Sequence, residues 1–188
     1  MNWPNVLTIS RLGFAVVLVY LLSLNSLIGN IWSAIFFIIA SLTDFYDGYL
    51  AKKKGLISNF GKIMDPIADK ILMLSIFSVL AYMGVIDWWM VILIAIREIL
   101  VTVDRLWSMY QGHILAAEHF GKIKTISQMT TVGVILLYLI LEQASFSHKW
   151  FYQIQNVYLG GINILMLITV LLTIGSGASY LQSRLKNI

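Results

Sequence analysis

The chain lacks cysteine and carries few charged residues. The absence of cysteine excludes a disulfide framework, a thiolate metal site and a cysteine nucleophile. Only 12% of the 188 residues are charged and 59% are hydrophobic, which is far from the balance of a soluble domain. The composition therefore predicts an integral membrane protein.

Six long apolar runs occupy almost the whole chain. Each is roughly 20 residues long, enough to cross a hydrocarbon core of about 30 Å. They lie at about 6–28, 31–52, 63–84, 88–111, 123–143 and 153–180. Because backbone polar groups in lipid must be satisfied within the span, we expect these runs to be helices. The sequence thus predicts an all-α integral membrane protein with six transmembrane helices. Residues 1–188 would form one domain, with a short interfacial segment at about 1–5.

The basic residues are distributed unevenly between the expected turns. The net charge of +4 could indicate nucleic acid as a partner, but the positions of the charges favour membrane topology instead. Even-numbered turns and the C-terminus hold Lys52, Lys53, Lys54, Lys62, Lys122, Lys124, Arg184 and Lys186, whereas the opposite turns hold only Lys149. By the positive-inside rule, both termini and the loops 53–62 and 112–122 are expected in the cytoplasm.

Four aspartates interrupt the second and third apolar runs. At about 100° per residue, one helix face holds Asp44, Asp47, Gly48 and Ala51, and another holds Gly61, Asp65 and Asp69. Ionisable groups inside a membrane span are costly unless a counter-charge compensates them. Two antiparallel helices joined by a short loop place both stripes at the same membrane face, so we expect the four carboxylates to converge on one pocket.

Such a group of carboxylates is suited to divalent cations. Hard oxygen ligands without histidine or cysteine favour Mg²⁺, Mn²⁺ or Ca²⁺. Four carboxylates carry enough charge for two ions, and a two-metal site is a common clamp for displacement at phosphorus. The acids could instead pair with lysines at the interface, but two shared stripes with three small residues favour the metal site.

The same run resembles the signature of the CDP-alcohol phosphotransferase family. That signature is Asp-x2-Asp-Gly-x2-Ala-Arg, then eight or more residues, then Gly-x3-Asp-x3-Asp. It is matched here by Asp44, Asp47, Gly48, Ala51, Lys52, Gly61, Asp65 and Asp69. The one departure is Lys52 in place of arginine, which keeps the positive charge but loses the planar fork. The six predicted spans agree with the fold of that family.

The resemblance implies roles for these residues. All four acids would hold two Mg²⁺ or Mn²⁺ ions, with Asp65 and Asp69 as the catalytic pair and Asp69 as the general base. The pocket for the CDP-linked lipid would be formed by Asn5, Thr8, Gly48, Ala51, Lys52 and Gly61. An alcohol would attack the lipid-side phosphorus of CDP-diacylglycerol, and CMP would leave. The active site would face the cytoplasm of a bacterial cell membrane.

Four basic residues are candidates for binding the acceptor. Arg97 and Arg105 in the fourth run could hold a phosphate through charge-assisted hydrogen bonds, together with Lys122 and Lys124 at the start of the fifth. The two lysines are about 200° apart on a helix, so both can serve one pocket only if Lys122 lies in a non-helical segment before the helix begins. Lys124, on one face with Gln128, is the stronger candidate.

The arginines also have acidic neighbours. Arg97 and Arg105 could pair with Glu98 and Asp104 instead of a ligand. Arg11 and Arg184 could border the same cavity.

A second resemblance concerns the acceptor. Segments at the N-terminus, around Arg97 and Arg105, and from Gly121 to Gln128 resemble those members of the family whose acceptor is glycerol 3-phosphate. In that pattern the stretch between the two arginines is apolar, whereas Asp104 adjoins Arg105 here. This acid could weaken phosphate binding or point elsewhere.

Other functions were compatible with parts of the sequence. The same chemistry could use inositol phosphate, serine or another alcohol as acceptor. A divalent-cation transporter would need polar groups at successive depths, yet the outer halves of the second and third runs are almost wholly apolar, and Asp87 and Glu142 lie only at the far interface. A purely structural scaffold leaves the buried acids unexplained. The small residues at 175–179 could serve a homodimer or internal packing.

Overall fold

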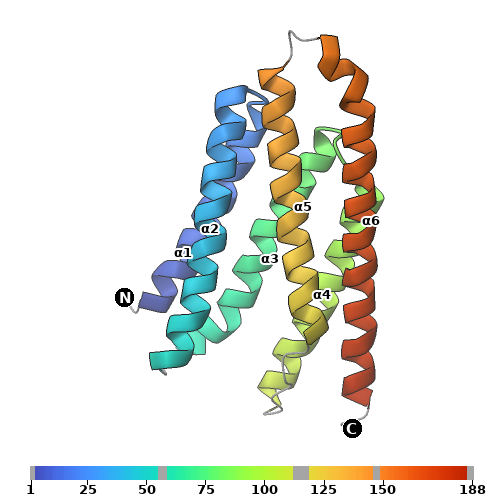
Figure 1. Cartoon of the computed structure of the whole chain (residues 1–188). Helices are drawn as coiled ribbons and strands as arrows, with labels where there is room; N and C mark the ends of the chain where they lie inside the picture. The colour runs from blue at the N-terminus through green and yellow to red at the C-terminus, as the bar shows by residue number, and fades with distance from the viewer. Residues whose placement is uncertain (1–2, 55–58, 112–118, 146–148, 186–188) are drawn as a thin grey trace.

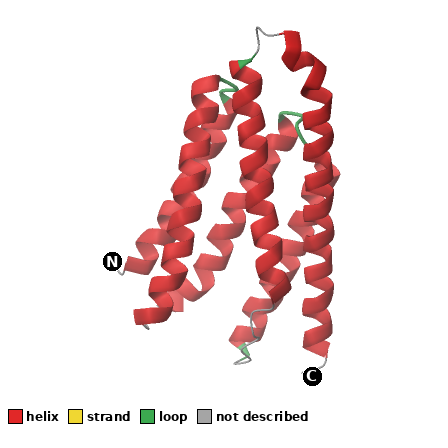
Figure 2. Cartoon of the chain, viewed as in Figure 1, coloured by secondary structure: helices red, strands yellow, loops and turns green. Residues whose placement is uncertain are grey.

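The computed structural model describes residues 3–54, 59–111, 119–145 and 149–185, and within them the side chains of 10–43, 64, 67–111, 121–145 and 154–184. These residues form six α-helices and contain no strand (Figures 1 and 2). The helices are α1 (Trp3–Ser23), α2 (Leu27–Lys54), α3 (Asn59–Tyr82), α4 (Trp88–Tyr110), α5 (His119–Ala144) and α6 (Lys149–Leu185). The all-α prediction is confirmed, with one helix for each apolar run.

Several helices extend past the ends of the apolar runs. α2 continues to Lys54 and α3 begins at Asn59, so both edges of the predicted loop 53–62 are helical. α5 already begins at His119, so the last residues of the predicted loop 112–122 are helical as well. Lysine is a good helix former, and adding a residue to an existing helix is far easier than nucleating one. α1 begins at Trp3, with Pro4 in the first turn, where its missing N–H is not needed. The interfacial placement of 1–5 stays a prediction.

The helices form a closed ring. α1 packs against both α2 and α3, α4 joins α3 to α6, and α5 joins α6 back to α2. α3 and α5 also meet across the ring. As a result, side chains from helices distant in sequence can reach one central space.

The core of the half of the bundle that holds the α1–α2 and α3–α4 turns is built from apolar side chains. Fully buried residues there include Leu22, Phe77, Leu80 and Leu139. The α3–α4 turn closes this end through Gly84, whose φ of 75° is the left-handed conformation that glycine adopts without strain. The other half is hollow and polar, and it contains the end of α2 and the start of α3.

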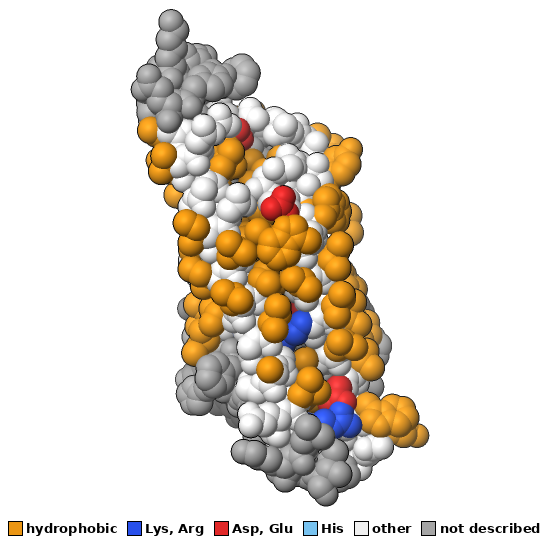
Figure 3. Space-filling model, turned by 90° about the vertical axis from the view of Figure 1, so that its right-hand side faces the viewer, with side chains coloured by type: hydrophobic (Ala, Val, Ile, Leu, Met, Phe, Trp, Pro, Cys, Tyr) orange, Lys and Arg blue, Asp and Glu red, His pale blue; other side chains and the backbone are white. Residues whose placement is uncertain are grey.

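The outer surface of the bundle is strongly apolar. Many large hydrophobic side chains are exposed, and they cover much of the face seen in Figure 3. Contiguous apolar surface of this kind is typical of contact with a membrane. Within the described residues, the stretches Gly121–Ala144 and Ile154–Arg184 are long and apolar enough to cross a bilayer. Six spans, and their orientation, remain predictions.

Candidate active site

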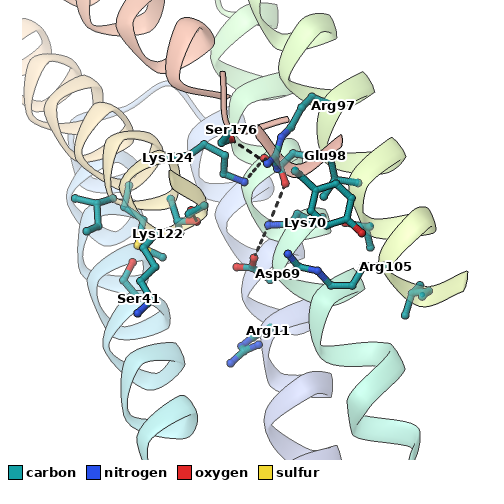
Figure 4. Close-up of a pocket in the computed structure, with 18 of the residues that line it drawn as sticks. Arg11, Ser41, Asp69, Lys70, Arg97, Glu98, Arg105, Lys122, Lys124 and Ser176 are labelled. Atoms are coloured by element: carbon teal, nitrogen blue, oxygen red, sulfur yellow. Dashed lines mark hydrogen bonds and ion pairs between the residues drawn. The ribbon is translucent and has the colours of Figure 1, made fainter. Parts of the chain in front are cut away.

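A cavity of about 740 Å³ lies in the polar half of the bundle. All six helices contribute to its lining (Figure 4). Its charged lining residues are Arg11, Lys70, Arg97, Arg105, Lys122 and Lys124, which are basic, and Asp69 and Glu98, which are acidic. The structure therefore brings all four predicted phosphate-binding residues together with the predicted general base, in a space with a clear excess of positive charge.

The predicted metal ligands lie at this end of the bundle, but only one of their side chains is described. Both acidic stripes are on continuous helix, in the last turns of α2 and the first turns of α3 (Figure 1). The side chains of Asp44, Asp47 and Asp65 lie outside the described set, as do Asn5, Thr8, Gly48, Ala51, Lys52 and Gly61. Among the side chains that are described, no three metal-binding groups lie together. The four-aspartate metal site stays a prediction.

Lys70 links the predicted base to the rest of the charged lining. Its Nζ lies 2.9 Å from Asp69 Oδ2 and 3.1 Å from Glu98 Oε2. Sequence reasoning missed this lysine. The available signal was its position directly after Asp69 inside a long apolar run, since an ionisable group there needs a partner.

Glu98 is the centre of the charged cluster. Its side chain is almost completely buried, with the residue 2% exposed. Its Oε1 accepts hydrogen bonds from Lys124 Nζ, from Gln128 Nε2 at 3.2 Å and from Arg97 Nη1 at 3.5 Å. The interpretation that Arg97 pairs with Glu98 is thus confirmed, but Glu98 also binds two lysines, from α3 and α5.

Arg97 is held between α4 and α6. Its Nη2 donates a hydrogen bond to Ser176 Oγ at 2.9 Å. A Cβ atom at Gly177 would lie 3.1 Å from Arg97 Cγ, so glycine allows the arginine stem to pass. Ser176 and Gly177 are buried. These two members of the 175–179 stretch serve internal packing, and the homodimer stays a prediction.

Asp104 points away from the cavity cations. Its Oδ2 accepts a hydrogen bond from Tyr180 Oη at 2.9 Å, and its carboxylate pairs with Arg184. Arg105 does not pair with Asp104 but lies over the Tyr180 ring, 5.8 Å from its centroid, and lines the cavity. Of the two alternatives for Asp104, the structure supports the one in which it points elsewhere, because its carboxylate lies on the α6 side of α4. Arg11 and Arg184 were both possible neighbours of the cavity: Arg11 does line it, whereas Arg184 pairs with Asp104.

Lys122 and Lys124 both line the cavity from helical positions. The expectation that Lys122 could do so only from a non-helical segment is wrong. The start of α5 lies beside the cavity, and the two long side chains reach different walls: Lys122 extends toward Ser41 and Lys124 toward Glu98 (Figure 4). Lys122 is exposed, whereas Lys124 is 3% exposed.

The contacts of Asp104 predict that it stabilises the fold and does not affect phosphate binding in the cavity, and this can be tested by substitution. We expect Asp104→Asn to lower the thermal midpoint of unfolding in detergent, because it removes the ion pair with Arg184 and weakens the bond from Tyr180. A loss of about 1 kcal/mol is typical for such contacts near a surface. Phosphate binding in the cavity should stay within about threefold, since Asp104 faces α6. Clearly tighter phosphate binding would show that Asp104 opposes the anion after all.

Comparison with known proteins places the chain in a family. The family model described as CDP-alcohol phosphatidyltransferase matches residues 1–175. The CDP-diacylglycerol–glycerol-3-phosphate 3-phosphatidyltransferase of Bacillus subtilis (strain 168) is 44% identical over 120 residues, which are 63% of this chain and 62% of the relative. The protein of the same name from Rickettsia bellii (strain RML369-C) is 35% identical over 136 residues, 72% of this chain and 75% of the relative.

A third relative matches along the entire chain. The probable phosphatidylglycerophosphate synthase of Mycobacterium tuberculosis (strain ATCC 25618 / H37Rv) is 32% identical over 192 residues, covering 100% of this chain and 83% of the relative. The match with the Bacillus protein covers less than two thirds of the length of that relative, whereas the match with the Mycobacterium protein covers more than two thirds of its length. Together with the family match over nearly all residues, these similarities show that the chain belongs to the CDP-alcohol phosphatidyltransferase family.

Proposed function

We propose that the chain transfers the phosphatidyl group of CDP-diacylglycerol to glycerol 3-phosphate, giving phosphatidylglycerophosphate and CMP in phospholipid synthesis. The relatives named for this reaction are 32–44% identical to the chain. The observation that carries the proposal is the single cavity in which Asp69 faces a set of basic side chains. A phosphorylated alcohol needs both a proton acceptor and an anion site.

The basic lining binds the phosphate of the acceptor. Among the described side chains Arg105 and Lys122 form no ion pair with a carboxylate and both line the cavity, and Arg97 presents its guanidinium from the neighbouring wall. Arginine matches phosphate oxygens through a planar fork, and charge-assisted hydrogen bonds are roughly twice as strong as neutral ones. An unphosphorylated alcohol would leave this excess of positive charge uncompensated, so the lining favours a phosphorylated acceptor.

Asp69 serves as the general base. The acceptor hydroxyl gives its proton to the Asp69 carboxylate as its oxygen bonds to the lipid-side phosphorus, and the bond from that phosphorus to the CMP oxygen breaks. Lys70, 2.9 Å from Oδ2, holds the carboxylate in place at the cavity wall. A positioned base of this kind contributes about 10²- to 10⁴-fold to a rate.

The oxygen donors at this end of the bundle fit divalent metals. Asp69 faces the cavity, and Asp44, Asp47 and Asp65 are carried by the adjoining turns of α2 and α3. These four acids would hold two Mg²⁺ or Mn²⁺ ions, which supply charge neutralisation at the diphosphate and polarise the reacting phosphorus. The CDP-linked lipid would lie against Asn5, Thr8, Gly48, Ala51, Lys52 and Gly61.

The cavity opens at the cytoplasmic side of a bacterial membrane. The proposed orientation is supported by the basic residues around the cavity and by the start of α1 and the end of α6, which lie in the same half of the bundle (Figure 1). A lipid donor can then enter from the leaflet while the soluble acceptor arrives from water. A cation pathway is less consistent with the structure, because buried apolar residues such as Ile76, Phe77 and Ile135 fill the bundle beyond the cavity.

An acceptor assay tests the proposal. Purified protein with CDP-diacylglycerol should release CMP when glycerol 3-phosphate is added, and should release little with glycerol, serine or inositol phosphate. Removal of divalent cations with EDTA should abolish turnover, and Mg²⁺ or Mn²⁺ should restore it. Activity with serine that ignores glycerol 3-phosphate would overturn the proposed acceptor, and full activity in EDTA would overturn the metal site.

A further inference from the structure

Glu98 stands out because it binds more positive charge than it can neutralise. One buried carboxylate contacts Lys70, Arg97 and Lys124, which come from three different helices. Lys70 is shared with Asp69, whereas Arg97 and Lys124 both contact Glu98 Oε1. Removing charges from water is costly, and a buried ion cluster is weak evidence for stability. The cluster therefore calls for an explanation other than folding.

The cluster fixes the directions of its cations. Lys124 is 3% exposed and cannot swing into solvent like a surface lysine. Gln128 Nε2 bonds Glu98 Oε1 at 3.2 Å and Thr173 Oγ1 at 3.4 Å, which ties the carboxylate to α5 and α6. Arg97 donates a hydrogen bond from Nη1 to Glu98 and one from Nη2 to Ser176. Each of these side chains has a defined position at the cavity wall before any ligand enters.

We propose that Glu98 is a positioning residue for the anion site: it holds Arg97 and Lys124 at the cavity wall, preorganised for the phosphate of the acceptor. This inference rests on the proposed function for the identity of that acceptor. It extends the proposed function by assigning the preference for a phosphorylated alcohol to the carboxylate of Glu98. Glu98 does not contact the reacting atoms. Its effect passes through the two cations, whose flexible side chains would otherwise lose entropy on binding.

The direction in which Glu98→Gln changes anion binding distinguishes this positioning role from a simple charge effect. Glu98→Gln removes a negative charge from the lining, so if Glu98 acted only through its charge, anions would bind more tightly. If Glu98 positions the cations, the same change releases Arg97 and Lys124, and anions bind more weakly. Glu98→Asp keeps the charge but withdraws the carboxylate by one methylene. It should also weaken binding, whereas a charge-only role predicts no change.

The experiment measures binding of inorganic phosphate to the purified protein by calorimetry, beside binding of CDP. We expect Glu98→Gln and Glu98→Asp to weaken phosphate binding by about tenfold or more, in line with the loss of charge-assisted contacts. CDP binding should change by less than about threefold, which shows that the fold is intact. The matched control is Glu142→Gln, because Glu142 is also hydrogen-bonded by neighbouring side chains but lies at the other end of α5. It should leave both affinities unchanged.

Kinetics give a second readout. Glu98→Gln should raise the KM for glycerol 3-phosphate and leave the KM for CDP-diacylglycerol near its original value. Unchanged or tighter phosphate binding in Glu98→Gln overturns the inference, and so does an absence of phosphate binding in the unaltered protein. Turnover with serine alone, combined with weaker phosphate binding in the variants, would overturn the proposed acceptor and leave the positioning role of Glu98 standing.

Discussion

Asp69→Asn is expected to reduce kcat by about 10²- to 10⁴-fold, the range that a positioned general base contributes. The amide has nearly the same shape as the carboxylate but does not accept the proton of the attacking hydroxyl. Asp69 is suited to this role because its side chain is 24% exposed at the wall of the cavity, where a ligand can reach it. The measurement is CMP release under saturating glycerol 3-phosphate.

The substitution must be separated from a loss of the site itself. Lys70 keeps its ion pair with Glu98 when Asp69 is changed, so the basic lining should persist. Binding of CDP in the presence of Mg²⁺ should be largely retained. Asp87→Asn is the matched control, because Asp87 is exposed at the N-terminal end of α4, away from the cavity, and its change should leave kcat unaltered. An Asp69→Asn protein that turns over normally would remove Asp69 from the role of base.

The helices could be predicted from the sequence because they follow from local patterns, and so could the gathering of several charged residues at one cavity. Long apolar runs identify the helices, and the spacing of Asp69 within its stripe fixes which face of α3 it occupies. The clustering of Arg97, Arg105, Lys122 and Lys124 was predicted from their charge and from the family resemblance. Such features do not require knowledge of how the helices pack.

The contacts of the individual side chains could not be predicted in the same way. Glu98 meets Lys70 and Lys124 only because α3 and α5 come together beside α4, which no local pattern encodes. The sequence likewise left open whether Asp104 pairs with its neighbour Arg105 or points elsewhere, and only the packing of α6 on α4 supplies its partners Tyr180 and Arg184. Adjacent residues can pair, as Asp69 and Lys70 do, but a partner from another helix is decided by packing, which the local sequence does not give.

Arg97→Met is expected to raise the KM for glycerol 3-phosphate by about 10- to 100-fold, because each lost hydrogen bond to a charged group is worth about 1.5–3 kcal/mol. Methionine has a flexible apolar chain that can occupy much of the space of the arginine stem beside Gly177. The KM of Arg97→Lys for glycerol 3-phosphate should lie between those of the unaltered protein and Arg97→Met. Lysine keeps the charge but loses the planar fork that spans Glu98 and Ser176.

The competing interpretation is that Arg97 only neutralises Glu98. In that case Arg97→Met would lower the free energy of unfolding while leaving the KM for glycerol 3-phosphate unchanged, since Lys70 and Lys124 would still compensate the carboxylate. Arg184→Met provides the control: it removes an arginine that pairs with an acid, Asp104, and is expected to reduce stability without changing this KM. The two variants together separate an arginine that binds the acceptor from one that only joins two helices, because both lose an ion pair but only Arg97 lines the cavity.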